Sequence, residues 1–250
     1  MSLPSLVFVH GAWHGPEHWE PLATVLRKEG FSCFTPLLDF CGSEHPVDSI
    51  ASSIRQIQQN LETETSAGRN VVVINHSFGG CVGCSSVKGF TKRDPSRLSD
   101  DSGYVVGIIQ LCAFMSPLRQ SLYDVVGTLV FHRHGPDGWE VIHHGDPRHL
   151  FYNDLSHEEA QHWKSFLRKQ STRALLDREN VYPGWADVPV WYLCCDQDNA
   201  IPIAGQEAGI MAARKAGATI TTRYIESGHS PFLSKTEKTA QFILEALASF

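Results

Sequence analysis

The fold of this chain is decided by residues 70–80, which read Asn-Val-Val-Val-Ile-Asn-His-Ser-Phe-Gly-Gly. The apolar run 71–74 is too short for a helix and rich in β-branched residues, which predicts a strand buried on both faces of a parallel sheet. Ser77 follows directly, and the small residues after it predict a helix. A serine on a tight strand-to-helix turn has the geometry of a nucleophile elbow, so Ser77 is the candidate nucleophile.

The stretch departs from the usual Gly-x-Ser-x-Gly pattern at one position. Asn75 stands two residues before Ser77, where glycine is usual, whereas Gly79 fits the position two residues after it. Asparagine tolerates unusual backbone angles better than most residues, so the turn remains compatible with this sequence. A polar strand end followed by an N-capping serine is the alternative interpretation of this stretch taken alone.

Composition narrows the class of protein. The chain has 250 residues, enough for one α/β domain, and its net charge of −6 argues against a nucleic-acid partner. The first residues lack the features of a signal peptide, and no apolar run approaches the roughly 20 residues of a bilayer span. The seven cysteines follow no spaced framework. We therefore expect a soluble, cytoplasmic monomer or homodimer without membrane insertion, acting on a small-molecule substrate with no cofactor or metal.

Strand-like and helical segments alternate along most of the chain, which predicts a parallel, doubly covered sheet. Apolar β-like runs occupy residues 5–10, 31–36, 71–74, 104–112, 188–195 and 219–225. Helical periodicity occupies residues 17–29, 204–215 and 235–250, and a further helix begins near Asp48 as N-cap. The alternation breaks between residues 116 and 187. We therefore predict a core of residues 1–115 and 188–250 with a cap or lid insertion at 116–187.

A serine hydroxyl needs a base, and the base needs an acid that orients it. Asp198 and His229 each follow a predicted strand, and the carboxyl ends of parallel strands converge on one crevice. His229 is therefore the candidate base and Asp198 the candidate acid, with Asp196 as a competitor. The backbone N–H groups of Phe78 and Ala12 are the expected donors to the oxyanion.

Several of these pieces resemble the α/β-hydrolase superfamily. They are His-Gly-Ala-Trp-His-Gly at 10–15, Asn-His-Ser-Phe-Gly-Gly at 75–80, Asp198 with Pro202 four residues on, and Gly228-His229. The chain is most similar to the plant methylesterase and hydroxynitrile lyase group and its microbial esterase relatives, which share a segment like Leu-Phe-Tyr-Asn-Asp at 150–154. The resemblance favours Asp198 over Asp196. The lyases carry a lysine directly after the histidine, where this chain has Ser230.

The resemblance implies an α/β-hydrolase fold: a mostly parallel sheet covered by helices on both faces, with a helical cap inserted before the strand that precedes the acid. Trp13 and His14 are expected to border the mouth of the site. An apolar pocket in the cap is expected to bind substrate, with packing of the cap onto the sheet as the competing role, through Leu122, Val125, Leu129, Phe131, Trp139 and Trp163.

The predicted function is that of a serine hydrolase that cleaves a carboxylic ester or lactone of a hydrophobic small molecule, such as a secondary metabolite. The same three side chains would also serve a C–C bond hydrolase or a thioesterase. An alternative of another class is a ligand-binding receptor on a hydrolase scaffold.

Overall fold

The computed structural model describes residues 3–93, 99, 101–127, 132–142 and 146–250. Its centre is a six-stranded sheet in the order β2-β1-β3-β4-β8-β9, in which every neighbouring pair is parallel. The strands are β1 (Ser5–Val9), β2 (Cys33–Phe34), β3 (Val71–His76), β4 (Val105–Leu111), β8 (Val190–Cys195) and β9 (Ile220–Ile225). The alternation predicted from the sequence is confirmed.

The strand β3 is buried along its whole length, as its unbroken apolar run predicts. Successive side chains point to opposite faces of a strand, so β3 contributes to two separate cores. Val71 and Val73 belong to one apolar cluster, and Val72 and Ile74 belong to the other. Helices must therefore cover both faces of the sheet.

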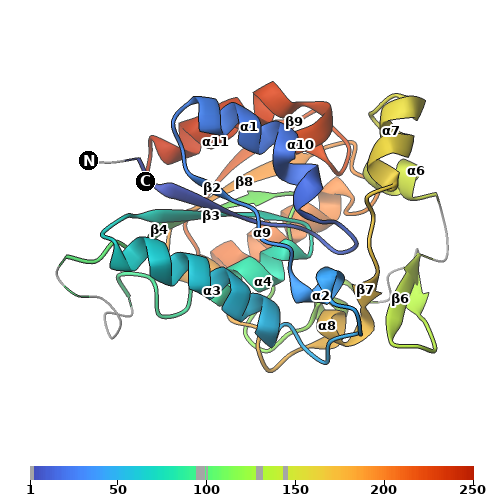
Figure 1. The fold of residues 1–250 in the computed structure, drawn as a ribbon, viewed down its shortest axis with the longest axis horizontal. Coiled ribbons are helices and arrows are strands. Elements are labelled where there is room, and N and C mark those ends of the chain that lie inside the picture. Colours follow the sequence, from blue (N-terminus) through green and yellow to red (C-terminus); the bar gives the residue numbers. More distant parts are fainter. Residues whose placement is uncertain (1–2, 94–98, 100, 128–131, 143–145) are drawn as a thin grey trace.

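Figure 1 shows these two helical layers. One face is covered by α1 (Glu20–Lys28), which follows the 3-10 turn η1 (Pro16–Trp19), and by α10 (Pro231–Ser234) and α11 (Thr236–Leu247). The other face is covered by α3 (Ala51–Ser66), α4 (Gly79–Ser86) and α9 (Ile203–Lys215). A short helix, α2 (Asp39–Gly42), precedes α3. In the described part of the chain, no helix combines the length and apolar character that crossing a bilayer requires.

The predicted N-cap of α3 is wrong. The helix starts after Ile50, whose N–H donates to Oδ2 of Asp177 at 2.9 Å. Asp48 instead forms an exposed ion pair with Arg173. A carboxylate far away in the sequence thus satisfies one of the free N–H groups at this helix end, which no local pattern could reveal.

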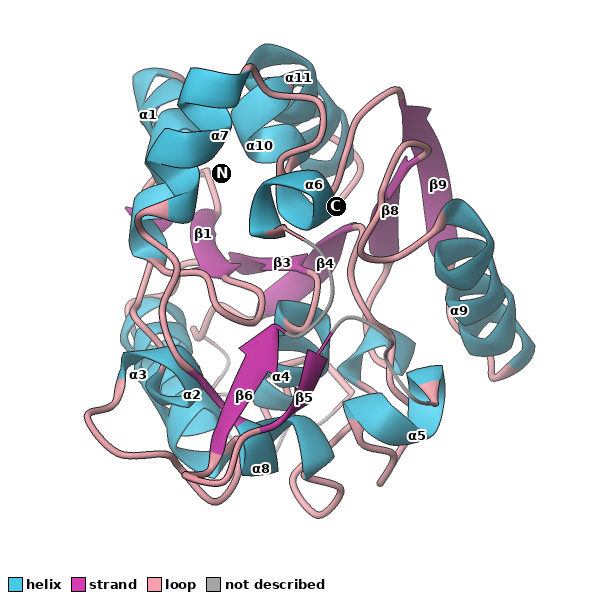
Figure 2. Ribbon diagram, turned by 90° about the vertical axis from the view of Figure 1, so that its right-hand side faces the viewer, coloured by secondary structure: helices cyan, strands magenta, loops and turns pink. Residues whose placement is uncertain are grey.

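The inserted segment adds a second, smaller layer over the carboxyl edge of the sheet (Figure 2). Its helices are short, and a three-stranded antiparallel sheet accompanies them. The helices are α5 (Leu122–Val126), α6 (Pro147–Phe151), α7 (His157–Lys164), α8 (Thr172–Leu176) and the 3-10 turn η3 (Gly184–Ala186). The strands are β5 (His132–His134), β6 (Trp139–Ile142) and β7 (Gln170–Ser171).

The strand order reverses between β1 and β3, because the chain runs from β1 outward to β2 and then back past β1. In an open parallel sheet, this reversal point leaves a crevice outside the carboxyl ends of the strands. Ala12 follows β1 and Ser77 follows β3, so both lie at the crevice. The fold therefore fixes where a site should form.

Candidate active site

Ser77 lies on the turn between β3 and α4 in a strained conformation. Its φ is 53°, in the left-handed region that residues with a side chain rarely adopt. Its carbonyl accepts hydrogen bonds from the N–H groups of Gly80 and Phe114, both at 3.0 Å, which hold the turn in place. The hydroxyl-bearing residue remains partly accessible. This geometry is that of a nucleophile elbow.

Close packing behind the turn explains two glycines. A Cβ on Gly79 would lie 2.4 Å from the Val9 carbonyl oxygen, so any side chain would push α4 away from β1. A Cβ on Gly83 would lie 1.8 Å from Oδ1 of Asn75. Asn75 is fully buried and its side chain lies against the middle of α4, where the missing side chain at Gly83 makes room for it. The absence of a side chain at Gly83, one helical turn after Gly79, thus provides the space for the asparagine at position 75.

Asp198 and His229 are joined at the ends of β8 and β9. Nδ1 of His229 lies 2.7 Å from Oδ2 of Asp198, and both side chains are buried. The other carboxylate oxygen, Oδ1, accepts the N–H groups of Ala200 and Ile201, both at 2.8 Å. Asp196, the competitor for this position, is exposed. Because Nδ1 is bound to the carboxylate, Nε2 is the ring nitrogen left for proton transfer.

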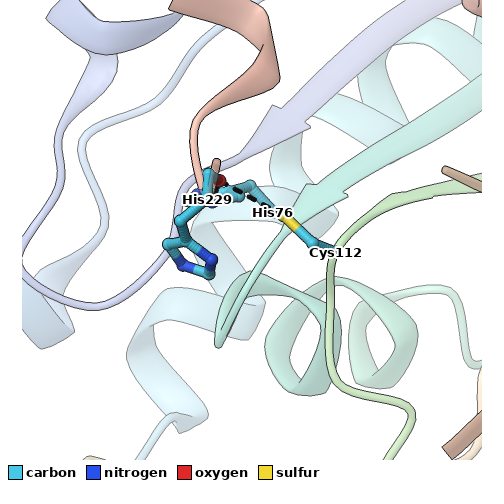
Figure 3. A group of neighbouring side chains, drawn as sticks. All are labelled: His76, Cys112 and His229. Carbon is cyan, nitrogen blue, oxygen red and sulfur yellow. Dashed lines mark hydrogen bonds between the residues drawn. The ribbon is translucent and has the colours of Figure 1, made fainter. Parts of the chain in front are cut away.

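The backbone of His229 has its own support (Figure 3). Its carbonyl accepts a hydrogen bond from Nε2 of His76 at 2.9 Å and from Sγ of Cys112 at 3.2 Å. Burial lowers the pKa of His76 well below its usual value and raises the pKa of the Cys112 thiol, so both groups are neutral donors. The nitrogen and sulfur atoms of His76, Cys112 and His229 lie close enough together to bind a metal ion. Because His76 and Cys112 donate hydrogen bonds to the His229 carbonyl, we interpret the group as a support for the backbone of His229.

A small cavity joins these groups. Its free volume is about 20 Å³, roughly the room that one water molecule needs. The lining residues come from the carboxyl ends of the strands and from the insertion: Ala12, Trp13, Ser77, Phe78, Phe114, Leu122, Phe151, Ala200, Ile201 and His229. In the described part of the chain, the N–H groups of Ala12 and Phe78 have no hydrogen-bond partner. Both residues line the cavity beside Ser77.

Some of the residues expected to contact substrate lie elsewhere. His14 is buried and bonded within the protein, because Tyr152 from the insertion packs over it. Trp139 is buried in β6, and Trp163 packs on His18 of η1. These three side chains therefore do not line the cavity, whereas Trp13 and Leu122 do. Leu129 and Phe131 lie outside the described residues.

Four residues of the cavity wall were missed from the sequence: Phe114, Phe151, Ala200 and Ile201. Phe114 follows β4, and Ala200 and Ile201 follow the turn of Asp198 after β8. Like Asp198, these three residues follow the carboxyl ends of strands, so the same argument could have predicted them from the sequence. Phe151 stands at the end of α6 beside the ring of His229, and only the packing of the insertion brings it there.

An oriented buried Asp–His pair and an elbow serine on a parallel sheet define the class of α/β hydrolases. The model of the alpha/beta hydrolase family matches residues 6–242, and the chain therefore belongs to that family.

The chain is similar over nearly its whole length to the alpha/beta hydrolase nvfD of Aspergillus novofumigatus, with 24% identity covering 98% of this chain and 97% of that protein. It is also 24% identical to methylesterase 18 of Arabidopsis thaliana, over 100% and 99% of the two chains. Among solved structures, a pyrethroid hydrolase from Sphingobium faniae JZ-2 matches with a TM-score of 0.79 and 17% identity, covering 99% and 98% of the two chains. At this identity the structural likeness shows the fold.

Proposed function

We propose that the protein is a serine esterase that hydrolyses a carboxylic ester or lactone of a hydrophobic small molecule. The observation that carries the proposal is the arrangement around one cavity. A strained serine, a histidine paired with a buried carboxylate, and two free backbone N–H groups all meet there. Acyl transfer through serine needs these parts together.

In the proposed reaction, Oγ of Ser77 attacks the ester carbonyl while its proton passes to Nε2 of His229. The carbonyl electron pair moves to oxygen, and the N–H groups of Ala12 and Phe78 bind the resulting oxyanion. Collapse of this intermediate breaks the bond to the alkoxide, which leaves as alcohol with the proton from His229. Water then repeats the sequence on the acyl-enzyme. Asp198 keeps the imidazole oriented and stabilises its charged form.

Two observations favour an ester over other acyl substrates. The similar proteins include a methylesterase and pyrethroid and polyneuridine aldehyde esterases or hydrolases. The cavity wall is mainly aromatic and aliphatic, and its described residues include no lysine or arginine. An uncharged, apolar ester suits such a wall.

Labelling with a fluorophosphonate tests the proposal directly. This reagent phosphonylates a serine only when a base and an oxyanion site activate it. We expect stoichiometric modification of Ser77, located by mass spectrometry of a proteolytic digest, and none in the Ser77→Ala variant. Folded protein that remains unlabelled, or that is labelled at another serine, would contradict the proposed function.

A larger groove adjoins the cavity and provides room for the substrate. It has a volume of about 520 Å³ and shares Phe114, Ala200 and Ile201 with the cavity wall. Small-molecule sites usually measure about 300–1,000 Å³. Its described lining is mostly apolar, includes Val125 of α5 and Gly209 of α9, and has no cationic side chain. We infer that the scissile bond lies at Ser77 and that the bulky apolar part of the ester lies in this groove.

Filling the groove should discriminate between large and small esters. A Cβ on Gly209 would meet nothing within 4 Å, so Gly209→Phe places a ring in open space, and α9 gains helix propensity. We expect kcat/KM for methyl 2-naphthoate to fall about tenfold, while that for methyl acetate stays within about twofold.

Met211→Phe is the matched control, because Met211 lies on the same helix with 69% of its surface exposed and does not line the groove. Both esters should be turned over at the wild-type rate in that variant. Equal losses for the two esters in Gly209→Phe, or no loss for either, would remove the groove from the substrate site.

A further inference from the structure

The hydroxyl of Tyr152 links two buried histidines of the segment between β1 and α1, His14 in the loop and His18 in η1. It lies 3.1 Å from Nε2 of His14 and 3.1 Å from Nε2 of His18. All three side chains are at least 98% buried. Tyr152 belongs to the insertion, just after α6, and lies 138 positions from His14 in the sequence.

The direction of each hydrogen bond follows from the partners. Nδ1 of His18 accepts the N–H of Gly15, so its proton is on Nε2, which the Tyr152 oxygen at 3.1 Å and the Trp163 carbonyl oxygen at 3.3 Å share as acceptors. Nδ1 of His14 lies 2.7 Å from the carbonyl oxygen of Ala12 and must donate to it. Nε2 of His14 is then an acceptor, and the Tyr152 hydroxyl donates to it. Burial lowers the pKa of both imidazoles, to about 4 for His18, so both remain neutral.

The chain of bonds ends at Ala12, whose N–H is the proposed donor to the oxyanion. The carbonyl of Gly11 accepts the N–H of His14 at 3.3 Å and Nδ1 of His10 at 3.0 Å. In a trans peptide the N–H points opposite to the carbonyl, so the Ala12 N–H is turned away from His10. The next carbonyl, that of Ala12, is held by His14. Both peptides that flank Ala12 are therefore fixed by histidine side chains.

We propose that Tyr152 is a positioning residue for the oxyanion site: by keeping His14 in the tautomer that donates to the Ala12 carbonyl, it holds the Ala12 N–H toward Ser77. The proposal rests on the esterase function above. In this proposal the insertion also fixes the geometry of the oxyanion site and does not only cover the substrate. A second bond from the insertion, from the N–H of Arg168 to the Trp13 carbonyl at 2.7 Å, holds the same loop.

The first test is Tyr152→Phe, which removes only the hydroxyl. Losing an oxyanion donor altogether typically costs about 100- to 1,000-fold, so misplacing it should lower kcat for methyl 2-naphthoate about 10- to 100-fold, with KM within about threefold. Affinity for a trifluoromethyl ketone analogue, which forms a tetrahedral oxyanion adduct on Ser77, should fall by the same factor. Tyr182→Phe is the matched control, since it removes another tyrosine hydroxyl bond, to Oδ2 of Asp187 at 2.8 Å, at a residue that lines neither the cavity nor the groove.

Rescue separates positioning from folding. The amide of an asparagine can donate to the Ala12 carbonyl from the place of Nδ1 without any help from Tyr152. His14→Asn should therefore keep most of the activity, and adding Tyr152→Phe to it should cost less than about threefold in kcat. His14→Gln, whose amide reaches the place of Nε2 instead, should resemble Tyr152→Phe.

Each result decides one point. Wild-type kcat and inhibitor affinity in folded Tyr152→Phe would overturn the positioning role, as would undiminished loss in the double variant. If Tyr152→Phe does not fold, the contrast between His14→Asn and His14→Gln still decides. Failure of the wild-type protein to label with fluorophosphonate would instead remove the proposed function, which the labelling reports independently of Tyr152.

Discussion

Replacing Ser77 with alanine is expected to lower kcat for ester hydrolysis by about 10⁴- to 10⁶-fold, the largest effect of any single substitution in this chain. The hydroxyl is the only group removed, and among the described residues that line the cavity no other side chain carries a hydroxyl or a thiol. The left-handed φ of 53° is as costly for alanine as for serine, so the free energy of unfolding should change little. Turnover of methyl 2-naphthoate with parallel thermal unfolding measures both quantities.

Ser165→Ala provides the comparison, because this serine is exposed at the end of α7. That variant should match the wild-type protein. If folded Ser77→Ala keeps more than about 1% of the activity, a different group must attack the ester. If the wild-type protein binds an ester but releases product only once, the receptor alternative gains support.

The second large effect is expected for Asp198→Asn, at about 10³- to 10⁴-fold in kcat. The asparagine amide can donate to Nδ1 of His229, which moves the imidazole proton to Nε2. The nitrogen that should take the proton from Ser77 would then carry one already. Geometry should be retained, because the remaining carbonyl oxygen can still accept the N–H groups of Ala200 and Ile201. Substrate KM should therefore change much less than kcat.

Asp196→Asn is the internal control for this substitution. It makes the same chemical change two residues away, at an exposed side chain. Near wild-type activity is expected there. Strong inactivation by Asp196→Asn combined with mild effects of Asp198→Asn would reverse the assignment of the acid and would require the loop after β8 to rearrange in solution.

The insertion contributes side chains to the site itself and does not only cover it. Leu122 and Phe151 line the cavity, and Tyr152 bonds to the histidine that holds the Ala12 carbonyl. The free volume at Ser77 is about 20 Å³, so we expect the cavity wall to open toward the adjoining groove when an ester binds. The insertion supplies residues of the cavity wall as well as Tyr152. We therefore expect opening of the cavity to be coupled to the geometry of the oxyanion site.

The fold was predictable because its signals are local. A run such as Val71 to Ile74 favours a strand whatever lies around it, and a fully buried strand requires helices on both faces. The family resemblance, confirmed by the match over residues 6–242, rests on short motifs at strand ends. The strand-end rule also placed Ser77, Asp198 and His229 at one edge of the sheet, where the structure has them. Their catalytic roles remain the proposal that labelling and substitution test.

By itself, the sequence determined the alternation of strands and helices, the turn at Ser77 and the edge of the sheet at which the chemistry should lie, since each depends on residues close together in the chain. Only the tertiary structure showed that Asp198 is bonded to Nδ1 of His229, turned His14 away from the cavity toward Tyr152, and gave Ile50 its partner in Asp177. Those contacts join residues that are distant in sequence, and the packing of the insertion against the core decides them. Side-chain shape and burial govern such packing, and neither periodicity nor short motifs encode it.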